Sequence, residues 1–206
     1  MIRSDVVGDL GRAVGVLSVA VPVDRPDRTG ERAAGRRAAA GALEAAGCPD
    51  LLVGADPDGR PRWPGDYVGS IAHTDRWAVA AVVRVEDFGA VGIDIERRDA
   101  LPVDDAEVVL SSSEREQVRA ARSPARAATL LWSAKEAAFK AWSSAHGRAI
   151  DPVDPVDIAI TVVDDRIMVR PCGALAAVVG TAGLTGRWAE LDDHVVTVVV
   201  APARLG

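Results

Sequence analysis

The chain has 206 residues, of which 49% are hydrophobic and 26% charged, a composition typical of a globular protein long enough to bury a core. Its formal net charge of −6 argues against a general nucleic-acid binder, for which a basic surface is expected. We find no apolar run long enough for a signal peptide or a membrane span. The two cysteines, Cys48 and Cys172, match no zinc spacing, and we expect free thiols in a cytoplasmic protein.

The first half of the chain is predicted to be a strand, a helix and a group of strands. A Val-rich stretch predicts a strand over 12–23, and an Ala- and Arg-rich helix is expected over 31–46 with Gly47 as its C-cap. A short strand at 51–54 leads into Pro- and Gly-rich turns over 56–65. Three β-branched runs with short connections then predict neighbouring antiparallel strands. These runs are 67–72, 77–85 and 90–95.

The second half begins with helices and ends with strands. A Ser-Ser-Glu-Arg start signal predicts a short helix over 113–121. Ser123 before Pro124 then opens a long helix that we expect to reach about Ser144. Its predicted buried side comprises Leu130, Leu131, Ala134, Ala138 and Trp142. A linker marked by Pro152 and Pro155 precedes predicted strands at 158–163, 166–170, 187–191 and 194–200.

This order of elements predicts an α+β fold of two similar subdomains, each a helix packed on a small antiparallel sheet. We expect a pseudo-two-fold relation between them, although no repeat of identical residues supports it. The N-terminal subdomain is placed at 1–100 and the C-terminal subdomain at 101–206.

The chemistry is concentrated in one predicted helix and one predicted strand. Only two of the 24 Lys and Arg residues are lysines, Lys135 and Lys140, and Glu136 lies between them. Glu136 and Lys140 are four apart and share a helix face, with Lys135 on the flank. Asp94 and Glu96 are two apart on a strand, so both project from the same face.

If that strand and helix are neighbours, Asp94, Glu96 and Glu136 form an oxygen-rich metal site. Hard oxygen ligands without His or Cys favour Mg²⁺, and Mn²⁺ accepts the same ligands. Each signal alone has an ordinary explanation: a solvated strand edge, a surface ion pair on a helix, and a turn residue at His73. Their combination predicts a divalent metal beside a phosphate.

The sequence resembles the 4′-phosphopantetheinyl transferases, in the monomeric class typified by surfactin- and enterobactin-pathway enzymes. The family motif Gly-Ile-Asp-x-Glu is matched by Gly-Ile-Asp-Ile-Glu at 92–96. The motif Trp-Ser-x-Lys-Glu-Ala-x-x-Lys is matched at 132–140, Ser-x-x-His at 70–73, and Gly-Arg-Pro-x-Trp-Pro at 59–64. The helix at 31–43 is similar to the Gly-Arg helix of the enterobactin-type enzymes.

The resemblance implies transfer of the phosphopantetheine arm of coenzyme A to a serine of an apo acyl or peptidyl carrier protein, with release of adenosine 3′,5′-bisphosphate. Asp94, Glu96 and Glu136 would hold Mg²⁺, and Lys135 and Lys140 would neutralise the phosphates. Glu136, Lys140 and Lys135 are the expected catalytic residues. The expected contacts to coenzyme A come from Arg36, Arg60, His73, Lys135 and Lys140. Either an acidic side chain or a metal-bound water near Glu136 would take the serine proton.

Two positions depart from the family pattern. Ala72 stands where many relatives have Ser before the motif His, and Ala40 stands where enterobactin-type relatives often carry a second Arg. These departures favour one alternative, a catalytically idle coenzyme A- or carrier-binding regulator of the same fold, whereas the complete set of acids and lysines favours the enzyme. A dedicated activator of a fatty-acid carrier protein is a further alternative.

Partners follow from the same resemblance. Carriers of polyketide or nonribosomal peptide synthases are the expected substrates, and the protein is expected to be a monomer that binds neither nucleic acid nor membrane. Because carriers present an acidic helix, we expect their docking surface between Arg97 and Arg126. Its candidate cations are Arg115, Arg119 and Arg122.

Overall fold

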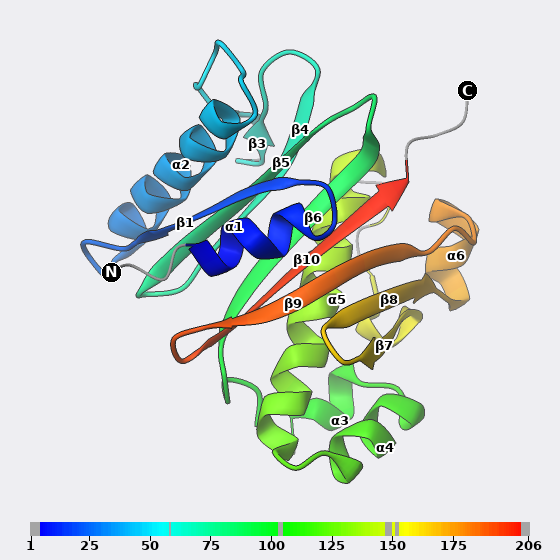
Figure 1. The fold of residues 1–206 in the computed structure, drawn as a ribbon. Helices are drawn as coiled ribbons and strands as arrows, with labels where there is room; N and C mark the ends of the chain where they lie inside the picture. Colours follow the sequence, from blue (N-terminus) through cyan, green and yellow to red (C-terminus); the bar gives the residue numbers. More distant parts are fainter. Residues whose placement is uncertain (1–4, 58, 103–104, 147–149, 151–152, 203–206) are drawn as a thin grey trace.

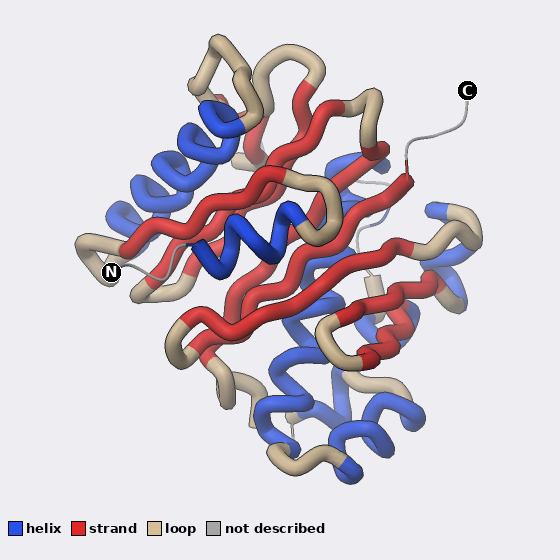
Figure 2. Tube along the Cα trace, in the orientation of Figure 1, coloured by secondary structure: helices blue, strands red, loops and turns tan. Residues whose placement is uncertain are grey.

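The computed structural model describes residues 5–57, 59–102, 105–146, 150 and 153–202; Pro152, expected in the linker, lies outside them. Two antiparallel sheets lie side by side, and helices cover their faces (Figures 1 and 2). The predicted α+β class is therefore confirmed. No helix among the described residues is long and apolar enough to cross a membrane.

The N-terminal elements form a three-stranded sheet covered by one long helix. Its strand order is β1-β5-β4, and α2 packs against all three strands. The elements are α1 (Asp5–Arg12), β1 (Leu17–Pro22), α2 (Arg28–Ala45), the small β2 (Gly54–Ala55) and β3 (Pro61–Arg62) hairpin, β4 (Tyr67–His73) and β5 (Trp77–Arg84). Helix α2 begins at the N-cap Asp27, whose side chain accepts from the amide of Gly30.

The C-terminal elements form a five-stranded sheet of order β6-β10-β9-β8-β7, with α5 packed on β6 and β10. The elements are β6 (Phe88–Arg97), α3 (Ala106–Val109), α4 (Ser112–Ala120), α5 (Pro124–His146), the 3₁₀ turn η2 (Pro155–Asp157), β7 (Ile158–Val163), β8 (Arg166–Pro171), α6 (Gly173–Val179), β9 (Leu184–Leu191) and β10 (His194–Pro202). All five residues predicted on the buried side of α5 are buried.

One predicted strand pairing is wrong. Strand β6 does not pair with β5, its neighbour in sequence, but with β10 along almost its whole length. The reason is that β10 offers a long Val-rich partner, and the pairing buries Ile93 and Ile95 in one core with Val196 and Val198. Sheet membership changes at the 85–87 connection, so Asp94 and Glu96 belong to the C-terminal sheet, and the subdomain boundary near residue 100 stays a prediction.

The two units repeat one plan. In each, a strand is followed by a long helix and a group of strands, and the last strand pairs with the first: β5 with β1, and β10 with β6. This arrangement agrees with the expected pair of similar sheet-and-helix subdomains. Helices α1, α3 and α6 were not predicted, because they have four to eight residues and are shorter than the stretch over which helical periodicity is judged.

Helix α5 and strand β6 touch through their backbones. A Cβ atom added at Gly92 would lie 1.8 Å from the carbonyl oxygen of Ala137 and 2.9 Å from the amide nitrogen of Ala141. Because real Cβ atoms do not approach so closely, only glycine permits this contact. It brings the middle of β6 next to the middle of α5.

A buried histidine joins the two units beside the carboxyl end of β6. His194, at the start of β10, is fully buried, and its Nε2 lies 3.1 Å from the hydroxyl of Thr74 in the β4–β5 turn. Its Nδ1 lies 2.9 Å from Asp193, and Arg76 and Arg97 add positive charge nearby. Burial lowers the pKa of His194, with an opposing effect from Asp193 and further lowering from Arg97 and Arg76.

We predict that this histidine makes stability depend on pH. Because its folded pKa is below the unfolded value of about 6.5, the neutral form is favoured in the fold and stability is lost as pH falls below that value. The melting temperature should therefore fall between pH 7.5 and 5.5 by more in the wild type than in His194→Gln. His73→Gln, at a more exposed histidine, serves as the control and should follow the wild type. Parallel curves for the wild type and His194→Gln would contradict the prediction.

Candidate active site

Strand β6 presents its two acids to α5. Val91, Ile93 and Ile95 are buried in the core on one face of the strand, so Asp94 and Glu96, which alternate with them, project from the other. That face meets α5 through the contact at Gly92. The expected proximity of strand and helix is therefore observed.

Asp94 is the most firmly held of the three acids. Its Oδ1 lies 2.5 Å from the ammonium nitrogen of Lys140, and its Oδ2 accepts a hydrogen bond from Ser133 Oγ at 2.8 Å. Thr197, opposite Asp94 on β10, donates to the carbonyl oxygen of Ser133 at 3.0 Å. The Asp94 side chain is 6% exposed and that of Lys140 28%, so the ion pair has one buried and one accessible member.

Glu96 and Glu136 are close enough to Asp94 for their charges to interact. Burial raises the pKa of Glu96 to about 7, with further raising by Asp94 and Glu136 and partial lowering by Lys140 and by a hydrogen bond from Trp132. Burial also raises the pKa of Glu136, with a lowering effect from Lys140 and a raising effect from Asp94. Asp94, Glu96 and Glu136 therefore lie within electrostatic reach of one another and of Lys140.

The donor set suits a hard divalent cation. Three crowded carboxylates without sulfur or imidazole are oxygen ligands of the kind that Mg²⁺ and Mn²⁺ prefer, and a cation would relieve the repulsion among them. In the described part of the chain, no three His, Cys, Asp or Glu side chains lie close enough to hold a metal ion as they stand. In this arrangement the charge nearest to Asp94 is the Lys140 ammonium.

Lys135 pairs with a different carboxylate, that of Glu114. Its side chain is 1% exposed, and its ammonium nitrogen lies 2.9 Å from Glu114 Oε2, whose side chain is also 1% exposed. It donates in addition to the carbonyl oxygens of Pro155 at 2.9 Å and Ile158 at 2.5 Å. Burial lowers the pKa of Lys135, and the hydrogen bond and charge of Glu114 oppose this effect. The structure therefore does not group Lys135 with Lys140 and the acids, because its three hydrogen-bonding positions are directed to Glu114 and the backbone.

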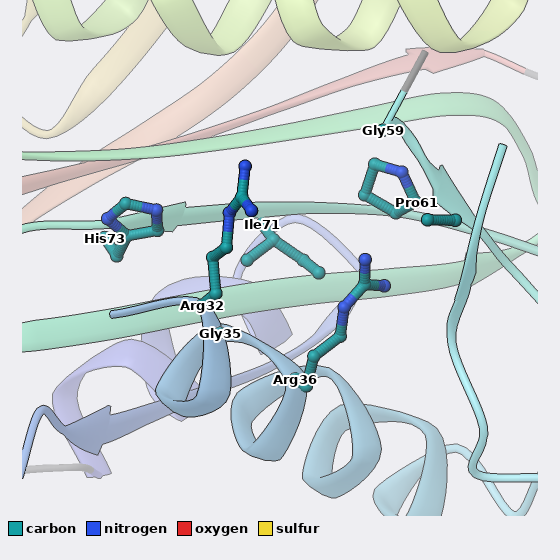
Figure 3. A pocket seen from close by; sticks show the side chains of 8 residues that line it. Arg32, Gly35, Arg36, Gly59, Pro61, Ile71 and His73 are labelled. Atoms are coloured by element: carbon teal, nitrogen blue, oxygen red, sulfur yellow. The ribbon is translucent and has the colours of Figure 1, made fainter. Parts of the chain in front are cut away.

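A basic groove runs along the N-terminal sheet. One section, of about 310 Å³, lies between α2 and β4 and contains Arg36 and His73, two of the residues expected to contact coenzyme A. Arg32 and Arg36 extend from α2 past Ile71 towards the open space, with His73 and Pro61 on either side (Figure 3). Arg32 was not among the expected contacts to coenzyme A, although its spacing of four from Arg36 places both on one helix face.

The groove continues towards α5. A second section, of about 600 Å³, shares Pro61 and Ile71 with the first and ends at Lys140. Its other lining residues are Asp56, Arg60, Trp63, Val68, Gly69, Ser70, Phe139, Ser143 and Ser144. Arg60, another expected contact to coenzyme A, therefore lines the groove. The path joins a cationic end near Arg32 to the acids around Lys140.

Some predicted details have different roles in the structure. Arg36 donates to the carbonyl oxygens of Val53 and Gly54 at 2.9 and 2.8 Å, so it also anchors the loop beside the groove. Ala72 is buried in the core between the sheets, on the strand face opposite Ile71 and His73. A residue at this position does not point into the groove section that His73 lines.

Comparison with known proteins agrees with this geometry. The model of the 4′-phosphopantetheinyl transferase N-terminal domain matches residues 20–83, and that of the 4′-phosphopantetheinyl transferase superfamily matches residues 90–198. The chain belongs to this superfamily. As a member it is a 4′-phosphopantetheinyl transferase, and the match boundaries agree with the division between the two sheets.

Curated relatives support the family and the type within it. The chain is 35% identical to the 4′-phosphopantetheinyl transferase Svp of Streptomyces mobaraensis, over 88% of this chain and 75% of Svp. It is 30% identical to enterobactin synthase component D of Salmonella typhimurium, over 86% of this chain and 74% of the relative. With the transferase Npt of Nocardia iowensis the identity is 38%, over 49% of this chain and 46% of Npt.

Two of the solved structures that match are a holo-[acyl-carrier-protein] synthase and an acyl carrier protein synthase. The Thermotoga maritima enzyme gives a TM-score of 0.46 at 20% identity, over 57% of this chain and 65% of that one. The Mycobacterium tuberculosis enzyme gives 0.40 at 28% identity, over 56% of this chain and 99% of that one.

The Lys135–Glu114 pair predicts a measurable coupling in this transferase. Lys135→Met leaves a buried carboxylate without its ammonium and should cost about 3–5 kcal/mol of unfolding free energy. Glu114→Gln should also destabilise, and the double variant should cost less than the sum of the two single changes. Urea unfolding of the four proteins measures the cycle. Additive losses would contradict a direct interaction within the pair.

Proposed function

We propose that this transferase moves the 4′-phosphopantetheine arm of coenzyme A to a serine of an apo acyl or peptidyl carrier protein, with Mg²⁺ required and adenosine 3′,5′-bisphosphate released. The observation that carries the proposal is the convergence of Asp94, Glu96 and Glu136 with Lys140 at the end of a basic groove. An anionic donor fits the groove, and the acids lie where its reacting phosphate would arrive.

The groove supplies the contacts that a long anionic donor needs. Arg32, Arg36 and His73 at one end suit a terminal phosphate, because guanidinium groups bind phosphate oxygens with paired hydrogen bonds. Lys140 at the other end brings a compact ammonium to the pyrophosphate. Trp63, Val68 and Phe139 provide apolar surface for the uncharged pantetheine arm. The two sections lie within the volume range of small-molecule sites.

Asp94, Glu96 and Glu136 would hold the metal ion. Bound there, Mg²⁺ supplies positive charge that offsets the phosphate oxygens and their repulsion of an incoming nucleophile. Lys140 adds charge of the same sign from the groove side. Ser133 and Thr197 hold Asp94 in position, so the site does not depend on solvent to orient that carboxylate.

The transfer itself is a displacement at phosphorus. The serine oxygen forms a bond to the phosphorus that carries the pantetheine arm, and the bond from that phosphorus to the bridging oxygen breaks, so adenosine 3′,5′-bisphosphate leaves with the bridging oxygen. Glu136 accepts the serine proton. Lys140 stabilises the charge that develops on the leaving side.

Carriers of polyketide or nonribosomal peptide synthases are the proposed acceptors, supported by the similarity to enterobactin synthase component D. The surface expected to bind them needs revision at one residue. Arg115 donates to the carbonyl oxygens of Glu107 and Leu110, both at 3.0 Å, and so terminates α3. Arg119 and Arg122 are exposed and keep their proposed role. A monomer is proposed because one chain supplies both the groove and the acids.

The first test is the intact mass of an apo peptidyl carrier domain after incubation with the protein, coenzyme A and Mg²⁺. We expect a gain equal to one phosphopantetheine arm, and no gain without metal or with Glu136→Ala. Losing both a metal ligand and the base should slow transfer by at least about 10³-fold. Coenzyme A binding without transfer to fatty-acid, polyketide or peptidyl carriers would instead favour the idle regulator.

The hydroxyls behind Asp94 should set the affinity for the metal. Ser133→Ala removes the hydrogen bond to Asp94, and we expect the Mg²⁺ concentration for half-maximal rate to rise about 10- to 100-fold. Thr197→Ser keeps the hydroxyl that holds Ser133 and is the matched control, with Thr197→Val as its counterpart. An unchanged Mg²⁺ requirement in folded Ser133→Ala would contradict this role.

A further inference from the structure

Lys135 is adjacent in sequence to the proposed base, yet its ammonium is directed away from the acids. The hydrogen bonds of its Nζ go to Glu114 Oε2 at 2.9 Å and to the carbonyl oxygens of Pro155 and Ile158 at 2.9 and 2.5 Å. Both carbonyls belong to the segment that turns from η2 into β7. A side chain on α5 therefore holds the backbone of this turn directly.

Glu114 completes the connection. Its Oε2 also accepts from the amide of Ser111 at 2.7 Å, closing the capping box of α4, and its Oε1 accepts from the amide of Ile160 at 2.8 Å. One buried carboxylate thus links α4, α5 and β7. Because both oxygens and all three ammonium protons have partners, the arrangement is a fully satisfied polar network, which favours a rigid geometry.

The turn held in this way is one wall of a crevice beside Glu136. The crevice has a volume of about 150 Å³; Trp132, Lys135, Glu136 and Phe139 line it from α5, and Val153, Pro155 and Ile158 from the opposite side. Pro155 and Ile158 are the two residues whose carbonyls Lys135 binds. The length of these hydrogen bonds therefore sets the distance between the opposite wall and Glu136.

The charge of the crevice differs from that of the groove. The Lys135 ammonium that lines the crevice is neutralised by Glu114, and Glu136 adds negative charge. The other lining residues are apolar. Phosphates are disfavoured there, whereas the groove across Phe139 contains Lys140. An uncharged hydroxyl with apolar neighbours is the kind of group that fits.

We propose that Lys135, held by Glu114, is a positioning residue for the acceptor: it fixes the 155–158 turn as the wall against which the carrier serine meets Glu136, and it does not contact coenzyme A. The proposal rests on the proposed transfer to a carrier serine. It assigns the two lysines of the helix to opposite substrates, Lys140 to the donor and Lys135 to the acceptor.

The test compares donor and acceptor parameters in the double variant Lys135→Met/Glu114→Gln, which leaves no unpaired buried charge. We expect coenzyme A to bind as tightly as to the wild type in calorimetry, while kcat/KM for the carrier falls about 10- to 100-fold because the serine is misplaced. Lys140→Met should instead weaken coenzyme A binding, because Lys140 is assigned to the donor. A merely structural role would not separate the two substrates in this way.

Leu184→Ala is the control for lost stability, because Leu184 is buried in the same core but on β9. It should leave the carrier kcat/KM at the wild-type value in protein that is folded. The positioning role is overturned if the double variant binds coenzyme A more weakly with an unchanged carrier KM, or if its carrier kcat/KM equals that of the wild type.

Hydrogen exchange gives a readout that needs no turnover. In the double variant the amides of 156–160 should exchange faster than in the wild type, whereas those of 93–96 on β6 should not change. Unchanged exchange at 156–160 overturns the positioning role. If the wild type modifies no carrier, the proposed function fails, and the exchange result still decides whether Lys135 holds the turn.

Discussion

Strand β6 approaches α5 so closely at Gly92 that a side chain there would overlap the carbonyl oxygen of Ala137. The functional residues depend on this contact. Asp94 is two residues along the strand from Gly92, and Ser133 and Lys140 lie on the helix on either side of Ala137, so both can reach one carboxylate. A wider separation would break the hydrogen bond and the ion pair together. The glycine of the Gly-Ile-Asp-x-Glu motif is thus required by packing, and the acids that follow it by chemistry.

The two lysines show how burial decides what a charge does. Both lie on α5 and each contacts a carboxylate, but Lys135 is sealed in the core with Glu114, whereas Lys140 is 28% exposed at the groove. A fully buried pair contributes little net stability compared with apolar residues, although breaking it is costly. Its value is geometric, because it fixes α4 and the 155–158 turn. Lys140 keeps access to ligands and can exchange one anionic partner for another.

Much of the fold could be predicted from local patterns. The start of α5 at Pro124, and that of α4 to within one residue, were visible because capping residues act within one turn. The pairing of β6 with β10 was not, because the two strands are about a hundred residues apart in sequence and their partnership depends on the combined core, not on either strand alone. The short helices α1 and α6 were missed because they span only eight and seven residues.

The candidate site could likewise be predicted only where the signal is local in sequence. Residue spacing placed Asp94 with Glu96, and Glu136 with Lys140, on shared faces, and the structure brings these pairs together. Spacing could not show which way Lys135 turns, because that depends on Glu114, which approaches from another helix. Ser133 and Thr197 were missed for a similar reason. Their partnership with Asp94 arises only once β10 lies beside β6.

The division between the sheets separates two tasks within one molecule. Every acid of the site lies on β6 or α5, in the C-terminal unit, whereas Arg32, Arg36, Arg60 and His73 belong to the N-terminal unit. Substitutions in α2 or in the β2–β3 hairpin can therefore change the affinity for the donor without moving the carboxylates. Over evolutionary time the recognition of the donor and the reaction itself can diversify at different rates, because the residues for each lie in separate units of the fold.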